Sequence, residues 1–298
     1  MASGNTIAGA RAARNIRPST KINTSNVHNI EEVWRWNADG VYPPDAYGAI
    51  KRVSIATGGR QFVSIDAETG KADPNFGDNG FVNLEVGLGR TFNVWAIGCS
   101  SPPIVCRDTI VVGSVISDGT ATKAQPPGHI RGFDARTGEQ KWQLHTIPQE
   151  GEFANDTWLN GSWKYTGGAN AWTMMSADEE LGYVYCPTGT PTSDFYGEFR
   201  PGNNLFAKSL ICLNAETGER VWHFQMIHHG MWDWGLPAAP NLIGIVVDGK
   251  PIKAVAQLGK TSYVYAFDRV TASPYGPSKS VRLRSRTPRN LPPSTGRA

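Results

Sequence analysis

The chain has 298 residues with a formal net charge of +3, 33 glycines, 20 prolines and 10% aromatic residues. Its length accommodates one large domain or two ordinary ones, and the abundance of glycine, proline and aromatic residues is typical of short strands joined by turns. The composition therefore predicts an all-β protein rather than a helical one, and no segment of these residues has the apolar length that a membrane span requires.

The N-terminal part predicts little regular structure. Residues 1–21 form an irregular leader in this interpretation, and the leader lacks the apolar run of a signal peptide. From the residues alone we therefore expect the product to stay in the compartment where it is made. A polar turn from Ile22 then leads into a strand that ends in Trp34-Arg35-Trp36.

Alternating apolar and polar residues, bounded by turn formers, predict a series of strands after this point. These strands lie at residues 51–57, 61–65, 103–106, 109–114, 129–133, 140–145, 183–186, 210–213, 220–226, 242–247, 253–257 and 262–267. Long connections interrupt the series at residues 117–127, 148–171 and 190–207. Because such long loops in a compact domain are usually functional, we expect them to lie on one face of the molecule.

One structural unit recurs along the chain. Four times an apolar strand runs into Asp or Asn and then into a Thr-Gly turn or its remnant, at residues 62–70, 132–142, 212–222 and 264–271. The Asx side chain caps such a turn, the glycine accepts a positive φ, and Trp142 and Trp222 on the returning strands are large enough to wedge between sheets. The repetition favours a β-propeller of about three to four blades, because a β-sandwich gives no reason to repeat one turn at one strand junction.

The end of the sequence departs from this pattern. Ala272 stands where the fourth turn glycine is expected, and residues 271–298 predict a disordered basic tail after a partial propeller at residues 22–270. Seven basic residues and no acidic residue follow Asp268, so the positive net charge belongs to the tail. Without interleaved aromatic residues or an apolar face, the tail does not predict nucleic-acid binding.

The cysteines give no sign of a metal or redox motif. Cys99, Cys106, Cys186 and Cys212 have no CxxC spacing, so neither a zinc ribbon nor a thioredoxin-type site is supported. Cys99 and Cys106 are candidates for a disulfide in an exported protein, but free buried thiols are the favoured interpretation.

Residues 221–237 gather three histidines and one aspartate among three tryptophans. We expect the tryptophans to desolvate Asp233 partly, which raises its proton affinity and suits it to act as a general base. His228 and His229 would point to opposite faces of an extended strand, so they cannot both bind one metal ion. Taken alone, turn hydrogen bonding by the histidines and packing by Trp232 and Trp234 are the commoner explanation of such a segment.

Two earlier runs, Asn155 to Trp163 and Asn170 to Pro191, precede this segment in the chain. Together the three motifs resemble the pyrroloquinoline quinone (PQQ)-dependent dehydrogenases, and above all the membrane glucose dehydrogenase branch. The resemblance runs from about Ile22 to Thr271 and implies an eight-bladed propeller with tryptophan docking motifs and PQQ near its axis. Such a ring needs roughly 450 residues, so we expect about half of it here, in a truncated or fragmentary member that is poorly soluble and little active alone. A shifted reading frame near Thr271 would explain both the lost repeat and the tail.

The resemblance also implies roles for individual residues. Asp233 matches the carboxylate that takes the hydroxyl proton as hydride passes to the quinone, and Trp172 matches the indole on which the quinone stacks. Lys260 matches the lysine that bonds the quinone oxygens. Asp118 matches an acidic residue beside the cofactor and its metal, which we expect to be Ca²⁺ or Mg²⁺. Thr190 replaces an Asn metal ligand of alcohol-oxidising members, and Gly235 replaces an Asp of lanthanide-using members.

The implied function is oxidation of an aldose such as glucose, or of another alcohol or polyol, with electrons passing from PQQ to ubiquinone or a cytochrome. By the same resemblance the protein would act in the periplasm or at the periplasmic face of the inner membrane. The alternative is a non-catalytic propeller that serves as a scaffold for protein–protein interaction. Retention of Asp233, Trp172 and Lys260 together separates the two, because a scaffold has no need of all three.

Overall fold

The computed structural model describes residues 52–118, 122–274 and 281–282. The predicted leader, the strand ending at Trp36 and most of the predicted tail lie outside these residues. The described strands form four main sheets, each composed of strands that are antiparallel neighbours in chain order. Within the described part, the helical elements are short 3₁₀ turns, η2 (Val94–Ala96), η3 (Asn155–Thr157) and η4 (Leu159–Lys164), and no helix there is long and apolar enough to cross a membrane.

The first sheet contains β1 (Arg52–Ala56), β2 (Gln61–Asp66) and β3 (Phe81–Asn83). The second sheet contains β5 (Ile104–Cys106), β6 (Thr109–Val112), β8 (Ile130–Asp134) and β9 (Gln140–Leu144). The third sheet contains β10 (Ser176–Asp178), β11 (Tyr183–Pro187), β12 (Ser209–Asn214) and β13 (Arg220–Gln225). The fourth sheet contains β14 (Asn241–Val247), β15 (Lys250–Leu258), β16 (Tyr263–Asp268) and β17 (Val281–Arg282), and a small pair joins β4 (Ile97–Gly98) to β7 (Val115–Ile116).

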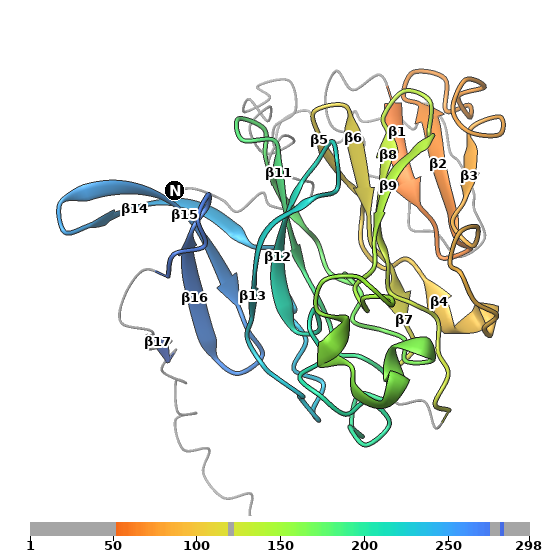
Figure 1. Cartoon of the computed structure of the whole chain (residues 1–298). Helices are drawn as coiled ribbons and strands as arrows, with labels where there is room; N and C mark the ends of the chain where they lie inside the picture. Colours follow the sequence, from red (N-terminus) through yellow and green to blue (C-terminus); the bar gives the residue numbers. More distant parts are fainter. Residues whose placement is uncertain (1–51, 119–121, 275–280, 283–298) are drawn as a thin grey trace, which may run out of the picture.

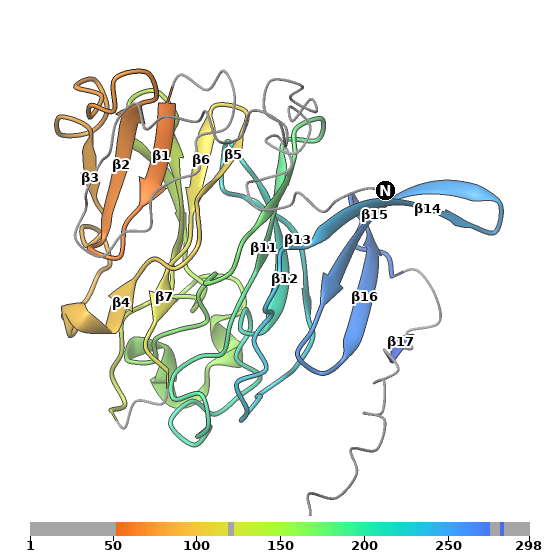
Figure 2. The same cartoon turned by 180° about the vertical axis from the view of Figure 1, so that it is seen from behind.

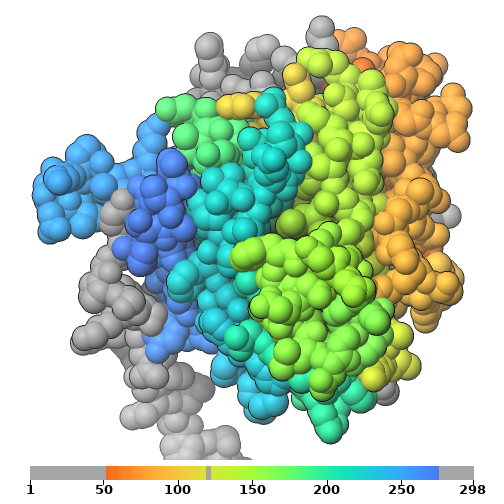
Figure 3. All heavy atoms as spheres, in the orientation of Figure 1, coloured from red at the N-terminus to blue at the C-terminus, as the bar shows by residue number. Residues whose placement is uncertain are grey.

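The four sheets stand side by side in chain order, like consecutive blades of a propeller that does not close into a ring (Figures 1 and 2). The predicted all-β class and partial propeller are therefore confirmed. The predicted strands from residue 52 onward correspond to observed strands. The strands β3, β4, β7, β10 and β17 were not predicted, and each has only two or three residues, which show little alternation; β17 lies within the predicted disordered tail. The hairpin of β14 and β15 projects from the body and leaves Val246 72% exposed at its tip (Figure 3).

The repeated turn has the same hydrogen bonds in all four copies. In each copy the Oδ1 of Asp66, Asp134, Asn214 or Asp268 accepts backbone N–H groups from the residues two and three positions later. Gly70, Gly138 and Gly218 then take φ between 70° and 74°. Ala272 keeps this conformation, with φ of 61° and its N–H bonded to the Asp268 carbonyl, so the fourth turn is formed without its glycine. Beyond it, β17 pairs with β16.

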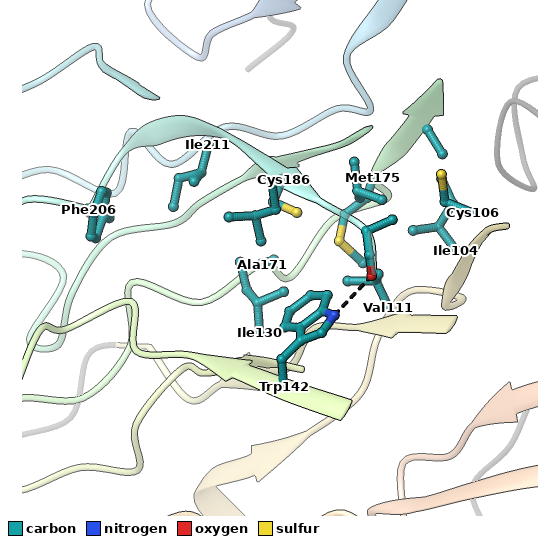
Figure 4. Close-up of a cluster of buried hydrophobic side chains, with 14 residues drawn as sticks. Ile104, Cys106, Val111, Ile130, Trp142, Ala171, Met175, Cys186, Phe206 and Ile211 are labelled. Carbon is teal, nitrogen blue, oxygen red and sulfur yellow. Dashed lines mark hydrogen bonds between the residues drawn. The ribbon is translucent and has the colours of Figure 1, made fainter. Parts of the chain in front are cut away.

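Tryptophans join the second sheet to the third and the third sheet to the fourth. The indole Nε1 of Trp142 donates to the Ala215 carbonyl in the turn of the third sheet at 2.9 Å, and that of Trp222 donates to the Arg269 carbonyl of the fourth sheet at 3.0 Å. A Cβ at Gly218 would lie 2.5 Å from the Trp142 ring, so the turn glycine provides the space that the indole fills. The predicted wedging between sheets is thus confirmed, and Figure 4 shows Trp142 within the core between the second and third sheets.

A buried ion pair adds a second link between the third and fourth sheets. Arg269 donates from Nη1 to Asp178 Oδ2 at 2.8 Å and from Nε to the Ala254 carbonyl at 2.9 Å. The two side chains are 9% and 1% exposed. Burial by itself raises the pKa of Asp178, but the hydrogen bond and charge of Arg269 and the N–H groups of its own turn lower that pKa to a net value below the ordinary one.

The long connections meet at one end of the sheets, as predicted, and hydrogen-bond to one another. Gln125 N–H donates to the Tyr165 carbonyl, and the Tyr165 hydroxyl donates to the Phe199 carbonyl at 2.7 Å. Leu159 N–H donates to the Pro201 carbonyl. Loops from three parts of the sequence therefore form one layer beneath the strands (Figure 1). All four cysteines are free thiols, and three of them are buried, which confirms the favoured interpretation.

Candidate active site

Four side chains from separate connections meet at this end of the sheets. Trp172 precedes β10, Thr190 follows β11, Asp233 lies between β13 and β14, and Lys260 lies in the turn after β15. Because neighbouring strands are antiparallel, the starts of β10 and β14 and the ends of β11, β13 and β15 all point to the same end of the third and fourth sheets. The fold therefore brings together residues that lie far apart in the chain.

Asp233 is held by an ion pair and a hydroxyl. Lys260 Nζ lies 2.6 Å from Asp233 Oδ2 and 2.9 Å from the backbone carbonyl of the same residue. Thr190 Oγ1 donates to Asp233 Oδ1 at 3.3 Å. The Asp233 and Lys260 side chains are 32% and 30% exposed, so the pair is partly screened from water but remains accessible from solution.

Trp172 forms the floor of the site. The Lys260 ammonium lies over its ring, 5.4 Å from the centroid, and the hydroxyls of Ser100 and Ser101 donate to its carbonyl at 2.8 and 2.7 Å. At the pyrrole edge of the indole, a Cβ at Gly189 would lie 2.9 Å from Cδ1 and a Cβ at Gly235 would lie 3.3 Å from Nε1. Gly235, which stands where lanthanide-using members have an Asp, therefore also leaves room for the Trp172 indole.

A tight turn presents the Asp233 carboxylate. Trp234 N–H donates to the Trp232 carbonyl at 2.6 Å, so Asp233 is the central residue of a γ-turn. The prediction that the neighbouring tryptophans desolvate Asp233 is wrong, because Trp232 and Trp234 are 60% and 43% exposed and Trp222 is used to join the sheets. Tertiary contacts with Lys260 and Thr190 provide the partial burial instead.

Two of the three histidines of this segment, His223 and His229, have structural partners. His229 has a φ of 41°, and its ring Nδ1 bonds the Gly202 carbonyl at 2.8 Å, which ties the Asp233 segment to the connection before β12. His223 on β13 lies 3.1 Å from Arg220 Nη1, and burial together with that guanidinium lowers its pKa to about 4. The structural explanation of the histidines therefore holds for both residues.

Asp118 is not joined to the other predicted site residues. It is exposed and follows β7, and no hydrogen bond or ion pair links it to Asp233, Trp172 or Lys260 among the described residues. Within residues 52–118 and 122–274, no group of three His, Cys, Asp or Glu side chains is placed to hold a metal ion. Any ion at Asp118 would therefore need further oxygen ligands, such as those of a bound cofactor.

Sequence reasoning missed two buried cations beside this site. Arg200 is fully buried and Lys208 is 1% exposed, and both donate to the Gly230 carbonyl at 2.8 Å. Burial, followed by the charge of Arg200, lowers the pKa of Lys208 to about 7, while Asp194 and Asp233 act in the opposite direction. The available signal was Lys208 directly after the apolar run from Leu205 to Ala207.

The arrangement suits a planar, anionic ligand with carbonyl oxygens. The indole of Trp172 offers a flat apolar surface, the Lys260 ammonium above it offers a charged donor, and Asp233 offers a carboxylate that can accept a proton. The glycines at 189 and 235 keep side chains away from the edge of the indole. These residues fit PQQ, which is an aromatic quinone.

The chain is similar to several known proteins. A family model described as PQQ glucose/ethanol/alcohol dehydrogenase, beta-propeller domain, matches residues 42–286. Quinoprotein glucose dehydrogenase A of Acinetobacter calcoaceticus is 33% identical over 236 residues, which are 76% of this chain and 28% of that protein. The glycerol dehydrogenase large subunit of Gluconobacter oxydans is 30% identical over 269 residues, which are 83% of this chain and 35% of that protein.

A solved structure shares the fold as well. The quinohemoprotein alcohol dehydrogenase ADHIIG of Pseudomonas putida HK5 superimposes with a TM-score of 0.64 at 26% identity, covering 76% of this chain and 32% of that one. The chain thus spans about a quarter to a third of the length of the curated relatives it matches.

Proposed function

The chain belongs to the family of PQQ-dependent glucose, ethanol and alcohol dehydrogenases, and on that basis we propose that it oxidises an aldose such as glucose, or another alcohol or polyol. The observation that supports this proposal is the convergence of Asp233, Lys260 and Trp172, which come from three different connections. A scaffold has no need of an ion pair placed over a half-buried indole. The catalytic proposal is therefore favoured over the non-catalytic propeller.

Each of the three residues has one task in this proposal. Trp172 binds the cofactor plane, and Lys260 carries the charge that faces its quinone oxygens. When bound, PQQ supplies the hydride acceptor. Asp233 accepts the proton of the substrate hydroxyl, while Thr190 orients its carboxylate through Oδ1. The flexible stem of Lys260 lets the ammonium move from Asp233 Oδ2 to the cofactor and frees that oxygen for the proton.

The metal is a separate part of the proposal. Asp118 would supply a hard carboxylate ligand for Ca²⁺ or Mg²⁺, and the other ligands would have to be oxygens from outside the described side chains. Thr190 lies against Asp233 and not against Asp118, which is in keeping with its place in the proton-accepting group rather than in a metal site. Replacement of Asp118 by Asn is then expected to weaken the dependence of PQQ binding on Ca²⁺ without changing the fold.

The acceptor and the compartment complete the proposal. Electrons leave through ubiquinone or a cytochrome, and the reaction takes place in the periplasm or at the periplasmic face of the inner membrane. The names of the two matched relatives, which act on glucose and glycerol, and of the alcohol dehydrogenase structure define the substrate panel to be tested.

A cofactor titration tests the proposal directly. Purified protein is titrated with PQQ in the presence of Ca²⁺, Mg²⁺ or EDTA while the cofactor absorbance is followed, and dye reduction is then measured with glucose, glycerol and ethanol. We expect a saturable change that Trp172→Ala weakens by about tenfold or more, because stacking on an aromatic ring contributes on the order of 1–3 kcal/mol. Trp95→Ala is the matched control, since this 82% exposed indole lies beside Arg60 and not in the site. Equal binding by both variants would contradict the proposed site.

A further inference from the structure

The segment that carries Asp233 rests on two buried cations. Arg200 Nη2 and Lys208 Nζ each lie 2.8 Å from the carbonyl oxygen of Gly230. A carbonyl oxygen has two lone pairs, so this single group accepts both charged donors. Gly230 is three residues before Asp233, within the short stretch that ends in the γ-turn.

The absence of a side chain at Gly230 makes this contact possible. A Cβ at that position would lie 2.3 Å from Lys208 Nζ and 2.9 Å from its Cε. The ammonium therefore occupies the space where any other residue would place its first carbon. Charged hydrogen bonds of this kind are about twice as strong as neutral ones, so the pair of donors fixes the position of the Gly230 peptide.

The cations are themselves held by the connection before β12. Arg200 Nη1 donates to Asn204 Oδ1 at 3.0 Å, and Asn204 Nδ2 donates back to the Arg200 carbonyl at 2.9 Å. The backbone N–H of Lys208 donates to the Gly189 carbonyl at 2.9 Å, beside the edge of the Trp172 indole. Lys208 thus touches the Asp233 segment with its side chain and the Trp172 side of the site with its backbone.

Neighbouring backbone contacts bind the same two segments together. His229 N–H donates to the Asn203 carbonyl at 3.2 Å, and the His229 ring bonds the Gly202 carbonyl. Met226 N–H donates to the Lys208 carbonyl at 3.0 Å. The ammonium and guanidinium are the charged centre of a contact that runs from residue 226 to residue 230.

Packing alone does not explain a lysine at this position. A buried ammonium is destabilising unless it is paired and hydrogen-bonded, and an apolar side chain of similar volume is often at least as stable in such a place. The charge of Asp194, which is 1% exposed, favours both cations, and Asp233 favours the charged form of Lys208. Although its burial is unfavourable, the Lys208 ammonium donates its hydrogen bond to one peptide group of the Asp233 segment, the Gly230 carbonyl.

We propose that Lys208 and Arg200 are positioning residues that hold the Gly230 carbonyl and thereby keep the Asp233 carboxylate between Thr190 and Lys260. The role of Asp233 as a base rests on the proposed function. The restraint of residues 229–234 by the two cations does not depend on that function. When Lys208 is removed, the peptide between Gly230 and Met231 keeps only the Arg200 donor and is held less tightly. The carboxylate then spends less time in the position from which it can accept a proton.

Lys208→Met tests this proposal, because methionine fills a similar volume without the charge. We expect the thermal midpoint to stay equal or rise, while the amides of His229 and Trp234 exchange with deuterium about tenfold or more faster, since a hydrogen bond from a charged donor is lost. PQQ affinity and KM are expected to change less than about threefold while kcat falls by about tenfold or more. Lys141→Met is the matched control, since its ammonium donates at 2.8 Å to the Thr109 hydroxyl on the second sheet.

Gly230→Ala is the second variant and keeps both cations. The added methyl displaces the Lys208 ammonium. We therefore expect the amides of His229 and Trp234 to exchange faster here too, although the change is now in Gly230, the acceptor of the hydrogen bond, and not in Lys208, the donor. Unchanged exchange at His229 and Trp234 in both variants overturns the positioning role. A fall in the thermal midpoint with faster exchange throughout the sheets also overturns it, because that result describes a merely structural lysine. If the wild-type protein neither binds PQQ nor reduces dye, the proposed function fails, and the exchange experiment still decides the positioning role.

Discussion

Lys260 Nζ and Asp233 Oδ2 lie 2.6 Å apart, although 27 positions separate the two residues in the chain and the fourth sheet supplies only one of them. The same ammonium also bonds the Asp233 carbonyl and lies over the Trp172 ring. Lys260 is therefore the residue that joins the base to the floor of the site.

Lys260→Met is expected to affect ligand binding far more than stability. The ion pair is about one-third exposed, and pairs of this kind contribute about 0–1 kcal/mol to the free energy of unfolding. A hydrogen bond from a charged donor to the cofactor contributes about 1.5–3 kcal/mol, so PQQ affinity should fall by about tenfold or more. Absorbance titration and urea unfolding measure the two effects. Lys253→Met, which removes an exposed pair with Glu180, should leave PQQ affinity unchanged.

Asp233→Asn separates the base from the binding site. The amide keeps the shape of the side chain and the backbone carbonyl that accepts from Lys260, but it cannot take the hydroxyl proton. We expect PQQ affinity to stay within about threefold and turnover to fall by about 10²- to 10⁴-fold, the usual range for removal of a general base. Turnover is measured by dye reduction, with Asp248→Asn at the tip of the β14–β15 hairpin as control. Turnover close to that of the parent protein would exclude Asp233 as the base.

Ala272→Gly is expected to stabilise the protein. Ala272 has a φ of 61°, and a left-handed conformation is unfavourable by roughly 1–2 kcal/mol for a residue with a Cβ. The loss of one methyl contact and the flexibility of glycine in the unfolded chain offset part of this, so a net gain of about 0.5–1 kcal/mol is expected. Urea unfolding measures the change. Ala135→Gly, in the equivalent turn of the second sheet and without a positive φ, should be neutral or destabilising, and equal losses in the two variants would contradict the strain argument.

The buried pair of Asp178 and Arg269 predicts a loss of stability in acid. The pKa of Asp178 is net lowered in the folded protein, so its contribution is present above the ordinary carboxyl pKa near 4 and is lost as the pH falls through the lower folded value. Asp178→Asn should remove this part of the pH dependence and, because it leaves the guanidinium buried without its partner, lower the free energy of unfolding at pH 7 by about 3–5 kcal/mol.

Urea unfolding between pH 7 and pH 3 measures this dependence. Asp108→Asn is the control, because its pair with Arg136 is exposed and should change stability by less than about 1 kcal/mol. If Asp178→Asn retains the full acid dependence of the parent protein, other carboxylates are responsible for it.

The repeating unit of the fold could be predicted from local residues alone. The Asx side chain, the N–H groups that it accepts and the glycine with positive φ lie within five residues of one another, so local chemistry is sufficient to form the turn of each sheet. The packing of the following tryptophan between two sheets could also be predicted, because a large indole on a returning strand is stable only against another apolar surface. The resemblance identified Asp233, Trp172 and Lys260, and the structure brings those three residues together.

The contacts that support the site could not be predicted from the sequence. The partners of Asp233 come from connections tens of residues away, and their approach depends on how the third and fourth sheets stand against each other. The same holds for the exposure of Trp232 and Trp234, which local sequence suggested would be buried. Arg200 and Lys208 show the physical reason most clearly. Burial of a charge depends on which loop covers it, and loop packing is set by contacts that no single segment contains.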